Sequence, residues 1–313
     1  MCFLLFVASP NPSAAPIFTI DGKPLGIILQ SCKKEYASGD RQSDYFWSLE
    51  NVMHISYANS QLAYTKTGTG EAVLVLFHGF GQDHSAFHKW VDTLKESHTL
   101  YTFDLFFHGA SHWNSRSPVE KDHWKEIMLL FLEKENIKKF GVVGFSLGGK
   151  FAMITVEAFP SMVTELTLLA PDGIKTSFWY SLATYPIAVR ALFKSMILHP
   201  NRLYRLTKIL RRLKIVDQGL LRFAESQMDT EEKRRRVYFA WVYFRHLKPD
   251  LNQLVSLANQ HATSCRLLIG KYDKVIQAEN MKTFVGKIRK IQFDVIEAGH
   301  NDLIAKSIFH LSK

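Results

Sequence analysis

The chain of 313 residues contains no run of about 18 residues that is both apolar and uncharged, which excludes a multispanning membrane protein. Its three cysteines, Cys2, Cys32 and Cys265, are odd in number and widely separated, so neither a disulfide framework nor a zinc-binding CxxC pair is expected. Internal repeats and low-complexity tracts are also absent. The 47% hydrophobic and 22% charged residues support a packed core, and the length suits one α/β core with an insertion.

Positive charge is concentrated in one segment of the chain. Residues 175–248 hold sixteen Lys or Arg residues against five acidic ones, an excess of eleven positive charges. The rest of the chain holds 23 basic and 24 acidic residues and is nearly neutral. We therefore expect this basic segment to form a structural unit with a face of its own.

The first 45 residues carry two features of targeting signals, and neither is complete. The apolar run at residues 2–8 lacks the preceding basic residues of a secretory signal. Residues 25–34 resemble a lipoprotein cleavage box ending at Cys32, but the apolar part is only five residues long. The sequence predicts that residues 1–45 are a leader outside the catalytic core. Cytoplasmic localisation is the default expectation, with export or lipid anchoring left open.

From about residue 48 the hydrophobic pattern becomes regular. Residues 52–57 and 62–67 alternate apolar and polar positions around a short turn, which predicts a β-hairpin. Six later apolar runs are typical of strands buried on both faces, and helical periodicity appears between several of them. Strand–helix alternation of this kind predicts a mostly parallel sheet with helices on both faces. The six runs are 72–77, 100–105, 140–143, 166–170, 265–269 and 291–296.

Residues 174–262 interrupt this alternation. Buried strand runs are absent there, and leucine and isoleucine residues between Leu203 and Leu213 recur at helical spacing, with arginines and lysines between them. The segment therefore predicts at least two helices, and these coincide with the basic part of the chain.

Residues 144–148 read Gly-Phe-Ser-Leu-Gly, directly after a predicted strand and before a predicted helix. This setting is typical of a nucleophile elbow, in which Ser146 sits on a tight turn at the end of a strand. Gly144 and Gly148 are needed because a Cβ atom at either position would collide with neighbouring backbone. A match in this setting is far stronger evidence than the five-residue motif alone.

A serine hydroxyl needs a neighbouring base, and the base needs a group that sets its tautomer. His300 follows the last predicted strand and Asp273 follows the strand before it, so both are expected at the same sheet edge as Ser146. Asp172, after the strand at 166–170, is an alternative acid. Asp273 is favoured for its Gly-x-x-Asp context.

These motifs resemble the α/β-hydrolase fold superfamily, as do His78-Gly79-Phe80-Gly81 after one strand and residues 104–111 after the next. The resemblance implies a mostly parallel eight-stranded sheet with helices on both faces and an inserted helical cap. The corresponding divisions are 1–45 (leader), 46–173 (core, first part), 174–262 (basic helical cap) and 263–313 (core, second part).

The resemblance also implies the roles of the site residues. Ser146 would be the nucleophile, His300 the base and Asp273 the group that orients it. The backbone N–H groups of Phe80 and Leu147 would form the oxyanion hole. Supporting residues would be His78, Gly79, Gly144 and Gly148.

The expected activity is cleavage of a carboxylic ester of a small, hydrophobic molecule through an acyl-enzyme. C–C bond hydrolysis, a lyase reaction or acyl transfer by the same residues is an alternative, and so is a catalytically silent binding protein.

No Walker loop, GxGxxG after a strand or HExxH is present, so no cofactor and no metal are expected. Nucleic acid is not an expected partner. The cap is expected to turn its apolar side inward over the site and its basic side toward solvent or, weakly, an anionic membrane surface. The oligomeric state is left open.

Overall fold

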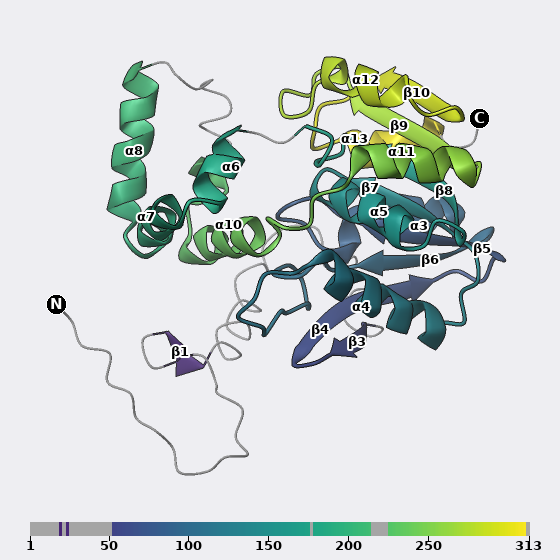
Figure 1. Ribbon diagram of the computed structural model, residues 1–313, viewed down its shortest axis with the longest axis horizontal. Coiled ribbons are helices and arrows are strands. Elements are labelled where there is room, and N and C mark those ends of the chain that lie inside the picture. Colours follow the sequence, from purple (N-terminus) through teal and green to yellow (C-terminus); the bar gives the residue numbers. More distant parts are fainter. Residues whose placement is uncertain (1–18, 21–22, 25–51, 176–177, 214–224, 311–313) are drawn as a thin grey trace, which may run out of the picture. The chain divides into compact units, whose positions relative to one another are not determined.

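The computed structural model describes residues 19–20, 23–24, 52–175, 178–213 and 225–310 (Figure 1). The chain divides into two compact units, residues 1–50 and 51–313. In the first unit, the described residues form β1 (Thr19–Ile20) and β2 (Lys23–Pro24), which pair in antiparallel orientation. The apolar run at residues 2–8 and the sequence around Cys32 lie outside the described residues.

The second unit is built on a sheet that has eight strands among the described residues, in the order β10-β9-β8-β7-β5-β6-β4-β3. Strand β4 runs antiparallel to both of its neighbours, and every other pairing is parallel. This is the predicted fold class. The strands are β3 (Met53–Tyr57), β4 (Ser60–Thr67), β5 (Ala72–Phe77), β6 (His98–Phe103), β7 (Phe140–Phe145), β8 (Val163–Leu169), β9 (Ser264–Gly270) and β10 (Ile291–Ile296).

The predicted hairpin and the six predicted strands are present. Burial on both faces is wrong for the run at 291–296, because β10 lies at the edge of the sheet and only Ile296 in it is buried. Strand β7 is buried along its whole length because it lies inside the sheet with helix α5 packed against it. The strand predicted at 100–105 begins and ends two residues earlier, at His98 and Phe103. The reason is that Asp104 leaves the strand, although its N–H still bonds to the carbonyl oxygen of Ala63.

Helices cover the sheet in two groups, and Figure 1 shows their positions around it. In one group, α5 packs against β5, β7 and β8 and also contacts α4 and α11. In the other, the indole N–H of Trp90 in α3 donates to the carbonyl oxygen of Ile304 in α13 at 3.0 Å. The helices are α3 (His88–Leu94), α4 (Lys121–Lys134), α5 (Leu147–Ala158), α11 (Leu251–Gln260), α12 (Lys282–Val285) and α13 (Leu303–Ser307), with 3₁₀ turns η2 (His84–Phe87), η3 (Ala278–Met281) and η4 (Ile308–His310).

Four described helices lie between β8 and α11 in the sequence. An apolar cluster of Phe193, Ile197, Val237 and Val242 joins two of them, α7 and α10. Within the described ranges, none of the chain's helices is both long and apolar enough to cross a membrane. The four helices are α6 (Phe178–Thr184), α7 (Ile187–Leu198), α8 (Pro200–Leu213) and α10 (Glu231–Tyr243).

Helix α8 differs from the expectation that its leucines all face inward. Leu203 and Thr207 are buried, but Leu206, Ile209 and Leu213 are exposed by 36%, 53% and 60%. The helix packs mainly against α7 rather than on the sheet core. Only one side of its apolar face is therefore covered, and the rest lies in solvent beside the arginines.

Candidate active site

Ser146 occupies a sharp turn between β7 and α5. Its φ of 50° and ψ of −116° are unfavourable for a residue with a side chain, so the surrounding backbone must hold it in place. The Ser146 N–H donates to the carbonyl oxygen of Leu169 at 2.9 Å. Its own carbonyl oxygen accepts from Gly149 N–H at 2.9 Å and from Asp172 N–H at 2.8 Å. The turn is anchored to both the helix and the neighbouring strand end.

The two glycines that flank Ser146 are required for close backbone contact, as the sequence predicts. A Cβ atom on Gly144 would lie 2.4 Å from the carbonyl oxygen of Gly148. A Cβ atom on Gly148 would lie 2.0 Å from the carbonyl oxygen of Phe77 in β5. A side chain at residue 144 would push the turn away from the start of α5, and one at residue 148 would push α5 away from the end of β5.

Ser146, His300 and Asp273 form a hydrogen-bonded chain across three loops. His300 Nε2 lies 3.0 Å from Ser146 Oγ, and His300 Nδ1 lies 2.6 Å from Asp273 Oδ2. Nδ1–H donates a hydrogen bond to the carboxylate, which leaves the lone pair of Nε2 directed at the serine hydroxyl. The three loops follow β7, β9 and β10, and parallel strands bring them to one edge of the sheet.

The Asp273 carboxylate is rigidly held. Its side chain is 0% exposed, and Oδ1 accepts the N–H groups of Val275 at 2.7 Å and Ile276 at 2.8 Å. His300 is 13% exposed, and its ring centre lies 5.0 Å from that of Phe145. Both groups are therefore positioned before any ligand arrives.

The alternative acid, Asp172, has a different partner. Its Oδ2 lies 3.2 Å from Lys150 Nζ, and Oδ1 accepts the N–H of Gly173 at 2.8 Å. The imidazole of His300 is hydrogen-bonded to Asp273 and Ser146 instead. Of the two candidates, Asp273 has the geometry of an orienting carboxylate.

His78 supports the loop that follows β5. Its Nε2 accepts the N–H of Leu105 at 3.0 Å, so Nδ1 carries the proton and donates to the carbonyl oxygen of Gly79 at 2.7 Å. Burial lowers the pKa of His78 and keeps the ring neutral. The ring links two loops and lies out of solvent, which suits a structural support better than proton transfer.

The predicted oxyanion donors come from this loop and from the start of α5. Leu147 is the first residue of α5, so its N–H has no acceptor within the helix. Among the described residues, none accepts the N–H of Phe80. Gly79 lies between His78 and Phe80 in the sequence. It leaves no room for a side chain, since a Cβ atom would lie 2.7 Å from the Phe145 ring.

Sequence reasoning did not identify the contact between His84 and Asp104 or the burial of Lys150. His84 Nδ1 lies 2.9 Å from Asp104 Oδ1. Burial alone would lower the pKa of His84, but the Asp104 carboxylate outweighs burial and raises it. Lys150, four residues after Ser146, is almost completely buried. The only signal for Lys150 in the sequence is a charge inside an otherwise apolar helix.

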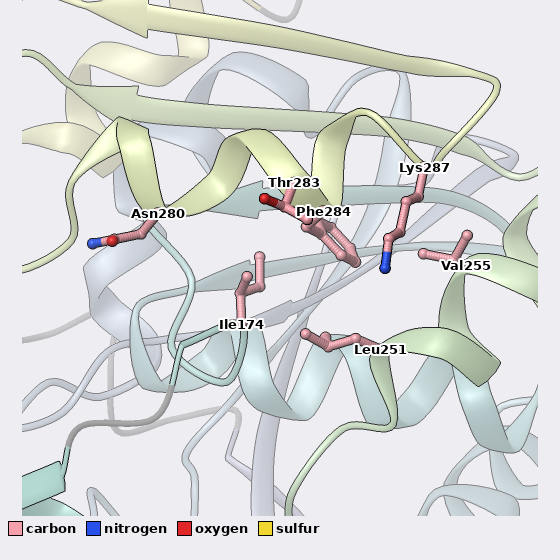
Figure 2. A pocket seen from close by; sticks show the side chains of 7 residues that line it. All are labelled: Ile174, Leu251, Val255, Asn280, Thr283, Phe284 and Lys287. Carbon is pink, nitrogen blue, oxygen red and sulfur yellow. The ribbon is translucent and has the colours of Figure 1, made fainter.

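A cavity of about 170 Å³ lies elsewhere (Figure 2). Figure 2 shows Ile174, Leu251 and Phe284 directed toward one another, with Lys287 near one side. Its lining includes none of Ser146, Asp273 and His300. It therefore carries no argument about where a substrate binds.

Comparison with known proteins agrees with this fold. The alpha/beta hydrolase fold family matches residues 72–190. Monoacylglycerol lipase abhd6-A of Xenopus laevis is 23% identical over 280 residues, covering 82% of this chain and 80% of the relative, and abhd6-B of the same organism is 25% identical over 293 residues. The structure of a thermophilic esterase from Thermogutta terrifontis has a TM-score of 0.62 at 16% identity, covering 84% of this chain and 96% of that one.

The chain has the alpha/beta hydrolase fold. The relatives named above carry the names of lipases and an esterase.

Proposed function

We propose that the protein hydrolyses a carboxylic ester through an acyl-enzyme formed on Ser146. The observation that carries this proposal is the hydrogen-bonded chain from Ser146 Oγ through His300 to Asp273, with distances of 3.0 and 2.6 Å. Both lie in the range expected for a nucleophile, its general base and the group that orients the base.

The reaction follows from these positions. His300 Nε2 takes the proton as Ser146 Oγ attacks the ester carbonyl, and Asp273 stabilises the imidazolium that forms. The N–H groups of Phe80 and Leu147 receive the oxyanion, and each such donor lowers the barrier by about 3 kcal/mol. His300 then gives its proton to the departing alcohol. In the second half of the reaction His300 takes a proton from water, which attacks the acyl carbon, and returns that proton to Ser146 Oγ as the acyl–serine bond breaks and the acid is released.

The substrate is proposed to be the ester of a hydrophobic acyl group. Phe80 packs against both the sheet core and the apolar cluster of α7 and α10, so apolar side chains surround one donor of the proposed oxyanion hole. The relatives named monoacylglycerol lipases suggest a glycerol monoester as a first compound to assay. We propose residues 174–262 as the cap, between core parts 46–173 and 263–313.

The test is turnover on p-nitrophenyl esters from acetate to palmitate and on a monoacylglycerol, with inhibition by a fluorophosphonate. The proposal expects hydrolysis of at least one ester, release of free acid and alcohol, and loss of activity on inhibition. Turnover that resists the fluorophosphonate, or the absence of turnover on every ester, would contradict it.

We further propose weak association of the cap with an anionic membrane surface. Leu206, Ile209 and Leu213 are exposed on α8, beside the exposed Arg205 and Arg212 on the same helix. Apolar side chains next to cations suit the interface of an acidic bilayer, where each cation contributes about 1 kcal/mol that salt screens.

Co-sedimentation with vesicles tests this surface. We expect binding to phosphatidylserine-containing vesicles at low salt, less at physiological salt, and none to phosphatidylcholine alone. The Ile209→Asp/Leu213→Asp variant should lose binding, whereas Leu129→Asp, an exposed leucine on α4, should not. Equal binding to both kinds of vesicle, or full binding by the α8 variant, would contradict the proposal.

A further inference from the structure

Lys150 is a buried cation on the helix that begins at Ser146. The residue is 6% exposed, and its ammonium lies 3.2 Å from Asp172 Oδ2 and 5.1 Å from the centre of the Tyr180 ring. A buried charge is costly unless it is paired, and here a carboxylate and an aromatic face pair it.

Each partner of Lys150 is tied to a different part of the molecule. The N–H of Asp172 donates to the carbonyl oxygen of Ser146 at 2.8 Å, inside the strained turn. Tyr180 belongs to α6, and its hydroxyl donates to the carbonyl oxygen of Trp241 in α10 at 3.1 Å. Lys150 thus stands between the Ser146 turn and two helices of the basic segment.

The ammonium is charged at neutral pH. Burial alone would lower the pKa of Lys150, but the attraction of Asp172 and Tyr180 outweighs burial and holds the pKa above its ordinary value. The ion pair is therefore maintained in the pH range in which a serine–histidine pair is active.

Stability alone is a weak explanation for this arrangement. Lys150 is buried, but the Asp172 side chain is 37% exposed, so solvent weakens the attraction between them. Ion pairs with a buried member often contribute no more to stability than well-packed apolar side chains of similar volume, but they impose a definite geometry. The geometry imposed here includes Asp172, whose backbone holds the Ser146 carbonyl. A displacement of about 1 Å at a reacting group can cost about a hundredfold in rate.

We propose that Lys150, Asp172 and Tyr180 form a positioning unit that connects α6 to the Ser146 turn and sets the reactivity of the serine. None of the three is a catalytic residue, since they act through the backbone of Ser146. The inference rests on the proposed role of Ser146 as nucleophile.

The test measures the second-order rate at which a fluorophosphonate labels Ser146, together with kcat and KM for p-nitrophenyl acetate. We expect Lys150→Met to lower the labelling rate and kcat by about tenfold with KM nearly unchanged, and Lys150→Arg to recover most of the loss. The matched control is Lys121→Met, which removes the 2.6 Å ion pair to Glu157 at the far end of α5 and should leave both rates unchanged.

Two further variants separate positioning from folding. Lys150→Met/Asp172→Asn leaves no buried charge unpaired, so it should fold and show the same tenfold loss. Tyr180→Phe keeps the ring under the ammonium and should keep the wild-type rate, whereas Tyr180→Leu should lower it.

The outcomes distinguish this inference from the proposed function. If the wild-type protein is labelled at Ser146 and both Lys150 variants are labelled as fast as the wild type, the proposed positioning unit is wrong and the proposed function stands. If the wild-type protein is not labelled at Ser146, the proposed function fails. If Lys121→Met lowers the labelling rate and kcat as much as Lys150→Met does, the effect would come from a general weakening of α5, and the inference would be overturned.

Discussion

Replacing Ser146 with alanine is expected to lower ester hydrolysis by about 10⁶-fold, to a rate near the limit of detection. The reason is that Ser146 Oγ is the only atom in the site at hydrogen-bond distance from His300 Nε2 among the described residues. Without it, no acyl-enzyme can form. The fold should remain intact because the backbone bonds of residue 146 to Leu169, Gly149 and Asp172 do not involve the side chain.

The measurement is steady-state turnover on p-nitrophenyl butyrate beside the thermal unfolding midpoint. An unchanged midpoint with activity lost assigns the effect to chemistry. Ser85→Ala is a suitable control, since Ser85 is an exposed residue of η2 and, among the described residues, its hydroxyl bonds only to Asp83, at 2.5 Å. Wild-type turnover in Ser146→Ala would show that another group performs the cleavage.

Replacing Asp273 with asparagine is expected to lower kcat by about 10⁴-fold. The asparagine oxygen would keep the two backbone N–H donors at the Oδ1 position, so its NH2 group would face Nδ1 and donate to it. The imidazole would then carry its proton on Nε2 and could not accept the serine proton. The Asp273 side chain is fully buried, and two backbone N–H groups donate to its Oδ1, so the asparagine side chain would be held in the same place.

Asp172→Asn is the matched comparison, because Asp172 also follows a parallel strand and was the competing acid. We expect only the tenfold loss of the positioning unit, a thousandfold less than for Asp273. The reverse ranking of the two variants would move the orienting role to Asp172.

The sheet, and the hydrogen-bonded series from Ser146 through His300 to Asp273, follow from features of the sequence. Runs such as 72–77 and 140–143 are apolar at every position, which strands covered on both faces require. Ser146 follows the run at 140–143, and Asp273 and His300 follow the predicted strands at 265–269 and 291–296. Parallel strands end at the same edge, so residues 154 positions apart come within 3.0 Å.

Other parts depend on contacts that no local pattern encodes. Asp172 satisfies the same sequence criterion as Asp273, and only packing decides that one faces Lys150 and the other His300. Helix α8 has the expected period, but the period does not say how much of the apolar face a neighbour covers. The extent of that cover, which leaves Leu206 and Ile209 in solvent, is set by α7.

The most direct test of the account is to trap the acyl-enzyme. The protein would be mixed with p-nitrophenyl butyrate, quenched in acid within the first turnover, digested and analysed by mass spectrometry. The account predicts a butyryl group on the peptide that contains Ser146, its absence in Ser146→Ala, and its accumulation in Asp273→Asn only after long incubation. A butyryl group on a different residue, or rapid turnover with no acylated peptide at any time, would contradict it.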